Sequence, residues 1–205
     1  MTGIHVKNHS DGTLAGVTQD HQIKTRTESH ELQHHVSWHD GDAYQVMYND
    51  TGINDTGGGD SSLLHLTNLS ATKNAVVSFI RLSAVTTGDT GGNAGDTGHY
   101  FELGFGSTIT AGDSGSAANA PVFVNMNRTS GKAAAMRAVG DGDMGGTFDR
   151  FDRVPAKFDG TQTVYNKHGS LILGQNDTMD IRFTSEGVGT ATARVTVMML
   201  NKERG

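Results

Sequence analysis

Histidines gather near the amino end of the sequence, in the stretch SHELQHHVSWH. Within it, His30, Glu31 and His34 form the H-E-x-x-H pattern of zinc proteases. On a helix, two histidines four positions apart lie one turn from each other and bind one zinc ion, while the glutamate acts as a general base. The pattern therefore makes a zinc-dependent protease one hypothesis for this chain.

The same segment also alternates in the manner of a β-strand, and this interpretation fits better. The residues that would share one strand face are Leu32, His34, Val36 and Trp38. In a strand, His30 and His34 lie about 13 Å apart, because each residue advances the chain by about 3.3 Å, and the same spacing separates His35 from His39. Such pairs cannot bind one zinc ion. We therefore expect an extended segment without a metal, whose histidines lie on a strand face or at a subunit contact.

Two further patterns resemble protease motifs. Residues 112–115, Gly-Asp-Ser-Gly, match the nucleophile loop of trypsin-type enzymes, and His65 is the only preceding histidine in an apolar setting. The D-T-G triplet of aspartic proteases occurs at Asp50, Asp55, Asp89 and Asp96. Each triplet follows asparagine or glycine, whereas an aspartic protease needs an apolar strand there. We interpret both patterns as loops, assign no catalytic residue, and expect that the chain is not an enzyme.

Loops and aromatic residues leave two binding hypotheses open. Asp141-Gly142-Asp143 and residues 89–96 could offer oxygen ligands to a Ca²⁺ ion, but neither follows the spacing of an EF-hand. We expect solvated loops there, and we assign no cofactor and no metal site. Trp38, Tyr44 and Tyr48 lie close in sequence and could form part of a carbohydrate-binding surface.

Composition limits the class of protein. The chain has 205 residues, of which 28 are glycine, 2 are proline and none is cysteine. The absence of cysteine excludes disulfides and thiolate metal sites. The net charge of −6 and the lack of a Lys/Arg block make nucleic acid an unexpected partner. No run of about 18 apolar residues is present, so we expect no membrane span, and the first residues lack the apolar stretch of a secretory signal.

Alternating apolar residues predict many half-buried strands. In residues 178–184, Met179, Ile181 and Phe183 should point inward, and Asp180 and Arg182 outward. The other predicted strands are 76–85, 99–106, 121–127, 169–174 and 191–200, with Val122, Val124 and Met126 on one face. Long polar loops are predicted at 50–62, 86–98 and 140–162, while 132–139 could be a short helix or a strand.

These elements predict an all-β, antiparallel β-sandwich, jelly-roll-like, with long Gly/Asp-rich loops. We expect an N-terminal arm at residues 1–15, which orders only against a neighbour, and a single sandwich domain at residues 16–205.

The order of segments in the second half carries a resemblance. An Asn-x-Asn-Arg-x-Ser stretch at 125–130 is followed by a Gly/Asp loop, a Gly-Ser-Leu-Ile-Leu strand at 169–173 and Asn-Asp-Thr-x-x-Ile-Arg-Phe-Thr at 176–184. Over residues 63–200 this pattern resembles small jelly-roll virion proteins of tailed bacteriophages, of the capsid decoration (cement) or tail-associated type.

The resemblance implies a non-enzymatic homotrimer that binds the major capsid protein or other virion subunits. It also implies a location in the virion, after assembly in the bacterial cytoplasm. A tail or fibre module that binds a host glycan remains the alternative.

Overall fold

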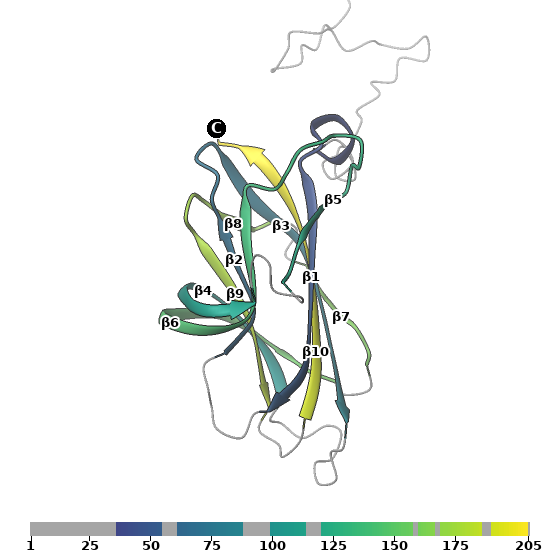
Figure 1. Ribbon diagram of the computed structural model, residues 1–205, viewed down its shortest axis with the longest axis vertical. Helices are drawn as coiled ribbons and strands as arrows, with labels where there is room; N and C mark the ends of the chain where they lie inside the picture. The colour runs from purple at the N-terminus through teal and green to yellow at the C-terminus, as the bar shows by residue number, and fades with distance from the viewer. Residues whose placement is uncertain are drawn as a thin grey trace, which may run out of the picture.

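The computed structural model describes residues 36–54, 61–87, 99–113, 120–157, 160–166, 169–185 and 190–204. The predicted arm at 1–15 lies outside these ranges, and the single domain at 16–205 stays a prediction. Among the described residues, every regular element is a strand except one short π-helix, η1 (Val36–Asp40), so none of their helices is long and apolar enough to cross a membrane. Two antiparallel sheets pack as a sandwich, which confirms the predicted fold class (Figure 1).

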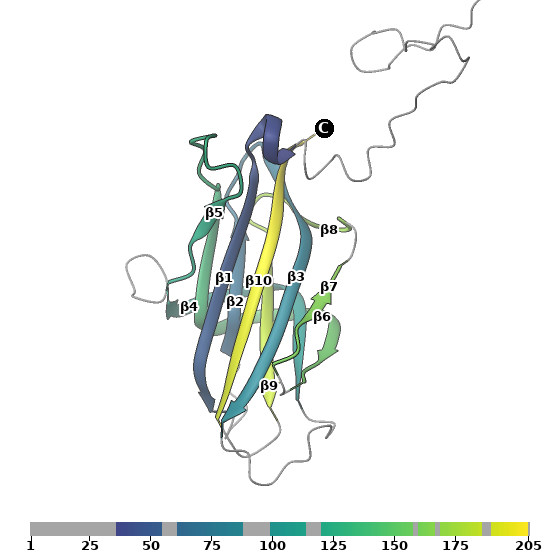
Figure 2. The same ribbon diagram turned by 90° about the vertical axis from the view of Figure 1, so that its right-hand side faces the viewer.

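The first sheet has long, regular ladders with a central strand from the carboxyl end of the chain. Its strands, in spatial order, are β5 (Phe123–Asn125), β1 (Ala43–Asn54), β10 (Thr190–Glu203), β3 (Lys73–Thr87) and β7 (Thr163–Tyr165), with β8 (Leu171–Leu173) also paired to β3. The strands β1, β10 and β3 run side by side (Figure 2). Val46, Val197 and Ile80 occupy one row across them, and all three side chains are fully buried.

The second sheet is curled. Its strands are β2 (Ser61–Asn68), β6 (Met136–Pro155), β4 (His99–Asp113) and β9 (Thr178–Ser185), and their pairing closes in the cycle β2-β6-β4-β9. The ladder between β4 and β6 contains four register shifts. Such irregularities bend strands and increase their twist, which explains how four strands can close on one another.

The core lies between the sheets, and alternation predicted much of it correctly. Leu66, Leu103 and Ile181 of the second sheet are fully buried against the first. The two sheets approach closely at Gly140 in β6, because a Cβ atom there would come within 2.2 Å of the ring of Tyr48. Glycine is therefore required at this position by the ring that packs over it.

The extended structure predicted through residues 30–39 is wrong over its second half. Residues 30–35 lie outside the described ranges, but Val36–Asp40 form the π-helical turn η1. The Asp42 N–H donates to the Val36 carbonyl at 3.0 Å, and Gly41 then adopts a φ of +63°. Val36 is buried against Ala43, Val76 and Leu200, so a turn buries this residue in place of a strand face.

Two other predictions also need correction. Residues 140–162 are not one loop, because β6 extends as far as Pro155. The same strand begins at Met136, which excludes a helix over residues 132–139. In the strand predicted at 121–127, only Phe123–Asn125 pair, and the face predicted to pack is exposed. The exposed side chains of that face are Val122, Val124 and Met126. Phe123 packs against the core instead, since alternation alone does not say which face of a strand is covered.

Candidate functional site

The residues of the protease-like patterns are not brought together in the described part of the chain. His30, Glu31 and His34 lie outside it, as do Asp55, Asp89, Asp96 and Ser114. His65 lies in β2 and Asp50 in β1, while Asp141 and Asp143 belong to strand β6 rather than to a loop. Among the described residues, no three His, Asp or Glu side chains lie close enough to hold a metal ion.

A buried polar network connects β2 to β9 in the curled sheet. His65 Nδ1 and Ser62 Oγ each lie 2.8 Å from Asp180 Oδ1, and all three side chains are buried. The prediction that Asp180 points outward to solvent is therefore wrong. The other face of β9 is not open to solvent here, and the carboxylate is instead satisfied by hydrogen bonds from the neighbouring strand.

The network has the order of groups found in a catalytic triad, with the imidazole and the carboxylate both buried. His65 Nε2 lies 3.1 Å from Thr67 Oγ1, which gives a hydroxyl, an imidazole and a carboxylate in sequence. Asp180 Oδ2 has no hydrogen-bond partner among the described residues. The hydrogen bonds to Asp180 join β2 to β9, and Thr67, which supplies the hydroxyl, is half-buried.

A second carboxylate, Asp42, lies at the end of the first sheet beside two lysines. Lys73 Nζ lies 2.7 Å and Lys132 Nζ 3.1 Å from Asp42 Oδ2. Burial alone raises the pKa of Asp42, but hydrogen bonds from these two ammonium groups and their charges outweigh it and hold the pKa below its usual value. The same contact raises the pKa of Lys73.

Of the three aromatic residues considered for carbohydrate binding, Tyr44 and Tyr48 do not lie on an exposed surface. Tyr44 and Tyr48 are buried in the sandwich, and the Trp38 side chain lies outside the description. Burial raises the pKa of Tyr44 to about 12, with a further contribution from Asp42, whose Oδ1 accepts a hydrogen bond from the phenol at 3.3 Å. A sugar-binding surface built on Tyr44 and Tyr48 is therefore excluded.

The Asn-x-Asn-Arg-x-Ser stretch fastens the segment after β5 to the start of β1. Asn125 Nδ2 lies 2.8 Å from the Gly41 carbonyl and 2.8 Å from Ser130 Oγ. The Asn127 side chain accepts a hydrogen bond from the Thr129 N–H at 3.1 Å, which closes a local turn. A Cβ atom at Gly41 would lie 2.3 Å from that of Ser130, so the two segments are in direct contact.

The outer face of the first sheet, which points away from the core, carries exposed apolar side chains in a regular array. Register places Met47, Thr196, Arg81 and Val164 in one row, and Val124, Gln45, Met198 and Phe79 in the next. Met47, Val124 and Val164 are 64%, 52% and 59% exposed. We use "outer face" for these two rows together with the flanking Asn49–Arg194 pair.

The charges on the outer face are positive. The Arg81 guanidinium lies 5.2 Å from the ring centroid of Phe79, and Arg194 Nε donates to Asn49 Oδ1 at 2.8 Å. Flat surfaces that combine exposed apolar groups with arginine are typical of protein contacts. Sequence reasoning missed this face because its residues come from five strands that are distant in the chain.

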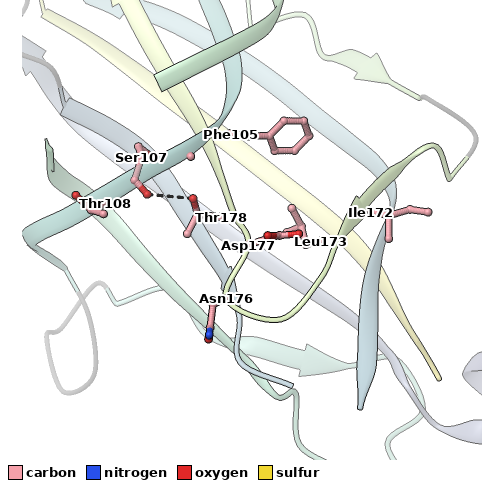
Figure 3. Close-up of a pocket in the computed structure, with 9 residues that line it drawn as sticks. Phe105, Ser107, Thr108, Ile172, Leu173, Asn176, Asp177 and Thr178 are labelled. Carbon is pink, nitrogen blue, oxygen red and sulfur yellow. Dashed lines mark hydrogen bonds between the residues drawn. The ribbon is translucent and has the colours of Figure 1, made fainter. Parts of the chain in front are cut away.

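A pocket of about 440 Å³ opens beside β4, where β8 and the turn before β9 complete its walls (Figure 3). Its lining residues are Phe105, Gly106, Ser107, Thr108, Ile172, Leu173, Asn176, Asp177 and Thr178. Thr178 Oγ1 donates to the Ser107 carbonyl at 3.0 Å, which joins two of the walls. None of these residues was predicted from the sequence as part of a binding site.

A scan against protein-family models finds no match to this chain, and a search of curated proteins finds none either.

Proposed function

We propose that this chain is a non-enzymatic structural subunit of a tailed-phage virion, with capsid decoration (cement) as its role. The strand order supports a jelly roll. In one sheet, the spatial order is β1, β10 and β3, and the short strands β7 and β8 both pair with β3. The other sheet contains β2, β9, β4 and β6. This is the arrangement expected when two Greek keys wrap into two sheets, an architecture found in viral capsid proteins. It is also the fold that the resemblance implies.

The observation that carries the proposal is the outer face. Exposed apolar side chains on a regular sheet are costly in water, and a neighbouring subunit that covers them removes this cost. We propose that another copy of this chain covers the outer face in a homotrimer. The other surfaces of the trimer would bind the major capsid protein. Many weak contacts of this kind, repeated over a symmetric shell, would stabilise the shell.

Charge favours a cyclic contact over a twofold one. In a twofold dimer through the outer face, Arg81 and Arg194 of both copies would enter one interface. In a cyclic trimer, the face of one copy meets a different surface of the next. Because the chain carries a net charge of −6, its carboxylates outnumber its cations and can supply partners for the two arginines.

The size of the particle in solution tests this proposal. We expect sedimentation of the purified chain to give a trimer, and Met47→Asp or Val164→Asp to give a monomer, because a buried unpaired carboxylate opposes association. The matched control is Leu69→Asp, which also places a charge at an exposed apolar residue, 52% exposed but away from the outer face. A monomeric natural chain, or loss of the trimer in the control, would contradict the assignment.

The copy number in purified particles tests the location. Hundreds of copies per virion, in a multiple of three, are expected for a shell decoration protein. A handful of copies would place the chain in the tail, and its absence from particles would overturn the proposed function.

A further inference from the structure

The geometry points to a second site: we propose that the pocket beside β4 binds the ring of a neutral sugar. This inference goes beyond the proposed function and does not depend on it, because none of the lining residues belongs to the outer face. A volume of about 440 Å³ lies within the usual range for small-ligand sites.

Apolar groups supply part of the pocket wall. Phe105 is half-buried and packs on Phe151 at 4.5 Å between ring centroids, which fixes its ring at the pocket. Ile172 of β8 also lines the pocket and is 51% exposed. A sugar ring has apolar C–H faces that can pack against such side chains, whereas an anion or a fully polar ligand would gain nothing from them.

Polar groups are placed around this apolar wall. Asn176 and Asp177 are exposed, and the amide of Asn176 can both donate and accept hydrogen bonds. Ser107 Oγ is buried and out of reach of a ligand, but Thr108, the next residue in the pocket wall, is exposed and offers its hydroxyl. A ligand with several hydroxyl groups could satisfy such donors and acceptors together, which is the pattern by which small-ligand sites fix orientation.

The turn that carries Asn176 and Asp177 is held in place before any ligand arrives. The Asn176 N–H donates to the Asn68 carbonyl at 2.7 Å, and the Asn68 N–H donates to the Asp177 carbonyl at 3.1 Å. Asp177 Oδ2 also accepts a hydrogen bond from the Gly174 N–H at 2.7 Å. A wall fixed in this way loses little conformational freedom on binding, so weak individual contacts can suffice.

Charge indicates which sugars fit. The lining residues include one carboxylate, Asp177, and no lysine, arginine or histidine. Phosphates and acidic sugars would therefore meet a negative group without a compensating cation. A purely apolar ligand would cover the exposed Thr108 and Asn176 side chains without replacing their hydrogen bonds with water. A neutral hexose or N-acetylhexosamine avoids both penalties.

Titration of the isolated chain with methyl glycosides of neutral hexoses and N-acetylhexosamines tests this site. We expect at least one to bind with saturation and to shift the backbone amide signals of Gly106, Ser107 and Asp177, while glucuronate binds more weakly. Asn176→Gly should lower the affinity about tenfold through loss of hydrogen bonds. The fold should persist, because Asn176 has a φ of +63° and glycine adopts it readily.

The matched control is Asp141→Gly, since Asp141 is the other described non-glycine residue with a positive φ, at +43°, and lies outside the pocket. It should leave sugar affinity unchanged. Absence of saturable binding by every neutral sugar would overturn the proposal, as would equal losses in the two variants. Binding that Asn176→Gly leaves intact would place the sugar elsewhere and overturn it too. None of these outcomes bears on the trimer, which sedimentation measures separately.

Discussion

The two sheets of the sandwich differ in the face that points away from the core. In the first sheet, the ladders of β10 with β1 and with β3 each contain a single register shift, and the face away from the core stays open, with Met47 and Val164 exposed. In the second sheet, four register shifts between β4 and β6 accompany a closed cycle of pairing. There several of the residues that alternate with the core, among them His65 and Asp180, are buried.

The difference shows how strand regularity decides what a polar residue can do. On a regular sheet, the outward residue meets water or a partner, so it is free to vary with the needs of assembly. On a curled sheet, the corresponding residue is enclosed and must find its hydrogen bonds within the protein. The first sheet is thus suited to contacts between molecules, and the second contributes internal rigidity.

The largest effect should come from removing the carboxylate of the enclosed network. Asp180→Ala leaves His65 Nδ1 and Ser62 Oγ without their acceptor in a buried site. We expect a loss of about 3 to 5 kcal/mol in the free energy of unfolding, measured by urea denaturation.

The matched variant is Asp180→Asn, whose amide oxygen can still accept both hydrogen bonds. It should lose about 1 to 2 kcal/mol, mainly because its NH₂ group is buried without a partner. A change below about 0.5 kcal/mol for the alanine variant would show that the second sheet is not held together by this network.

A smaller loss is expected at the carboxylate of the first sheet. Asp42→Asn removes the charge that pairs with Lys73 and Lys132, but Lys132 is exposed, so water compensates in part. We expect a loss of about 2 kcal/mol at neutral pH. Urea denaturation at several pH values measures both this loss and its dependence on pH.

The sign of that dependence follows from the lowered pKa of Asp42. The unfolded carboxyl titrates near its ordinary value of 3.8, and the folded one titrates below it. The stabilisation is therefore complete above about pH 4 and disappears as the pH falls through the folded pKa. Asp42→Asn should lose less stability than the natural chain on acidification, and an identical acid profile for both would contradict the assigned ion pairs.

Glu102 in β4 provides the corresponding test on the second sheet. Burial raises the pKa of Glu102, but hydrogen bonds from Arg153 and Arg150 and their charges outweigh it and leave the pKa lowered. Glu102→Gln should therefore flatten the acid profile in the same direction as Asp42→Asn. Opposite directions would show that one of these carboxylates is not paired with cations in solution.

The smallest effect on stability is expected on the open face. Val164→Thr keeps the branched shape that suits a strand and replaces an exposed apolar group, so the free energy of unfolding of the monomer should change by less than about 0.5 kcal/mol. The measurement belongs in the Met47→Asp background, where we expect no trimer. A large loss there would mean that Val164 packs within its own chain, which would erase the contrast between the two sheets.

The strands were predictable from sequence because alternation is a local property. Ile181 and Phe183 were correctly assigned to the core, since two buried positions on one strand specify the face. The burial of Asp180 was not predicted, because local alternation separates the two faces of a strand without revealing that β6 and β4 close off the second face. The burial predicted for Val122 and Val124 was wrong for the converse reason. These residues alternate as in a core strand, but no second layer of the described residues covers them.

The candidate sites depend on contacts that sequence alone does not encode in a readable form. The outer face combines β5, β1, β10, β3 and β7, whose neighbours are set by topology. The pocket combines Phe105 with Asn176, which the turn before β9 brings to the same opening. The π-helical turn at Val36–Asp40 spans too few residues for periodicity to distinguish it from a strand.

The position of β10 has a consequence for biosynthesis. This strand is the last described one to leave the ribosome, yet it lies between β1 and β3. Until residue 203 emerges, those two nascent strands have no partner between them and present unpaired edges to other chains. Folding of the first sheet must therefore wait until β10 has been synthesised, and it proceeds at the slow rate typical of long-range pairing. Truncated translation products that lack β10 should aggregate rather than fold.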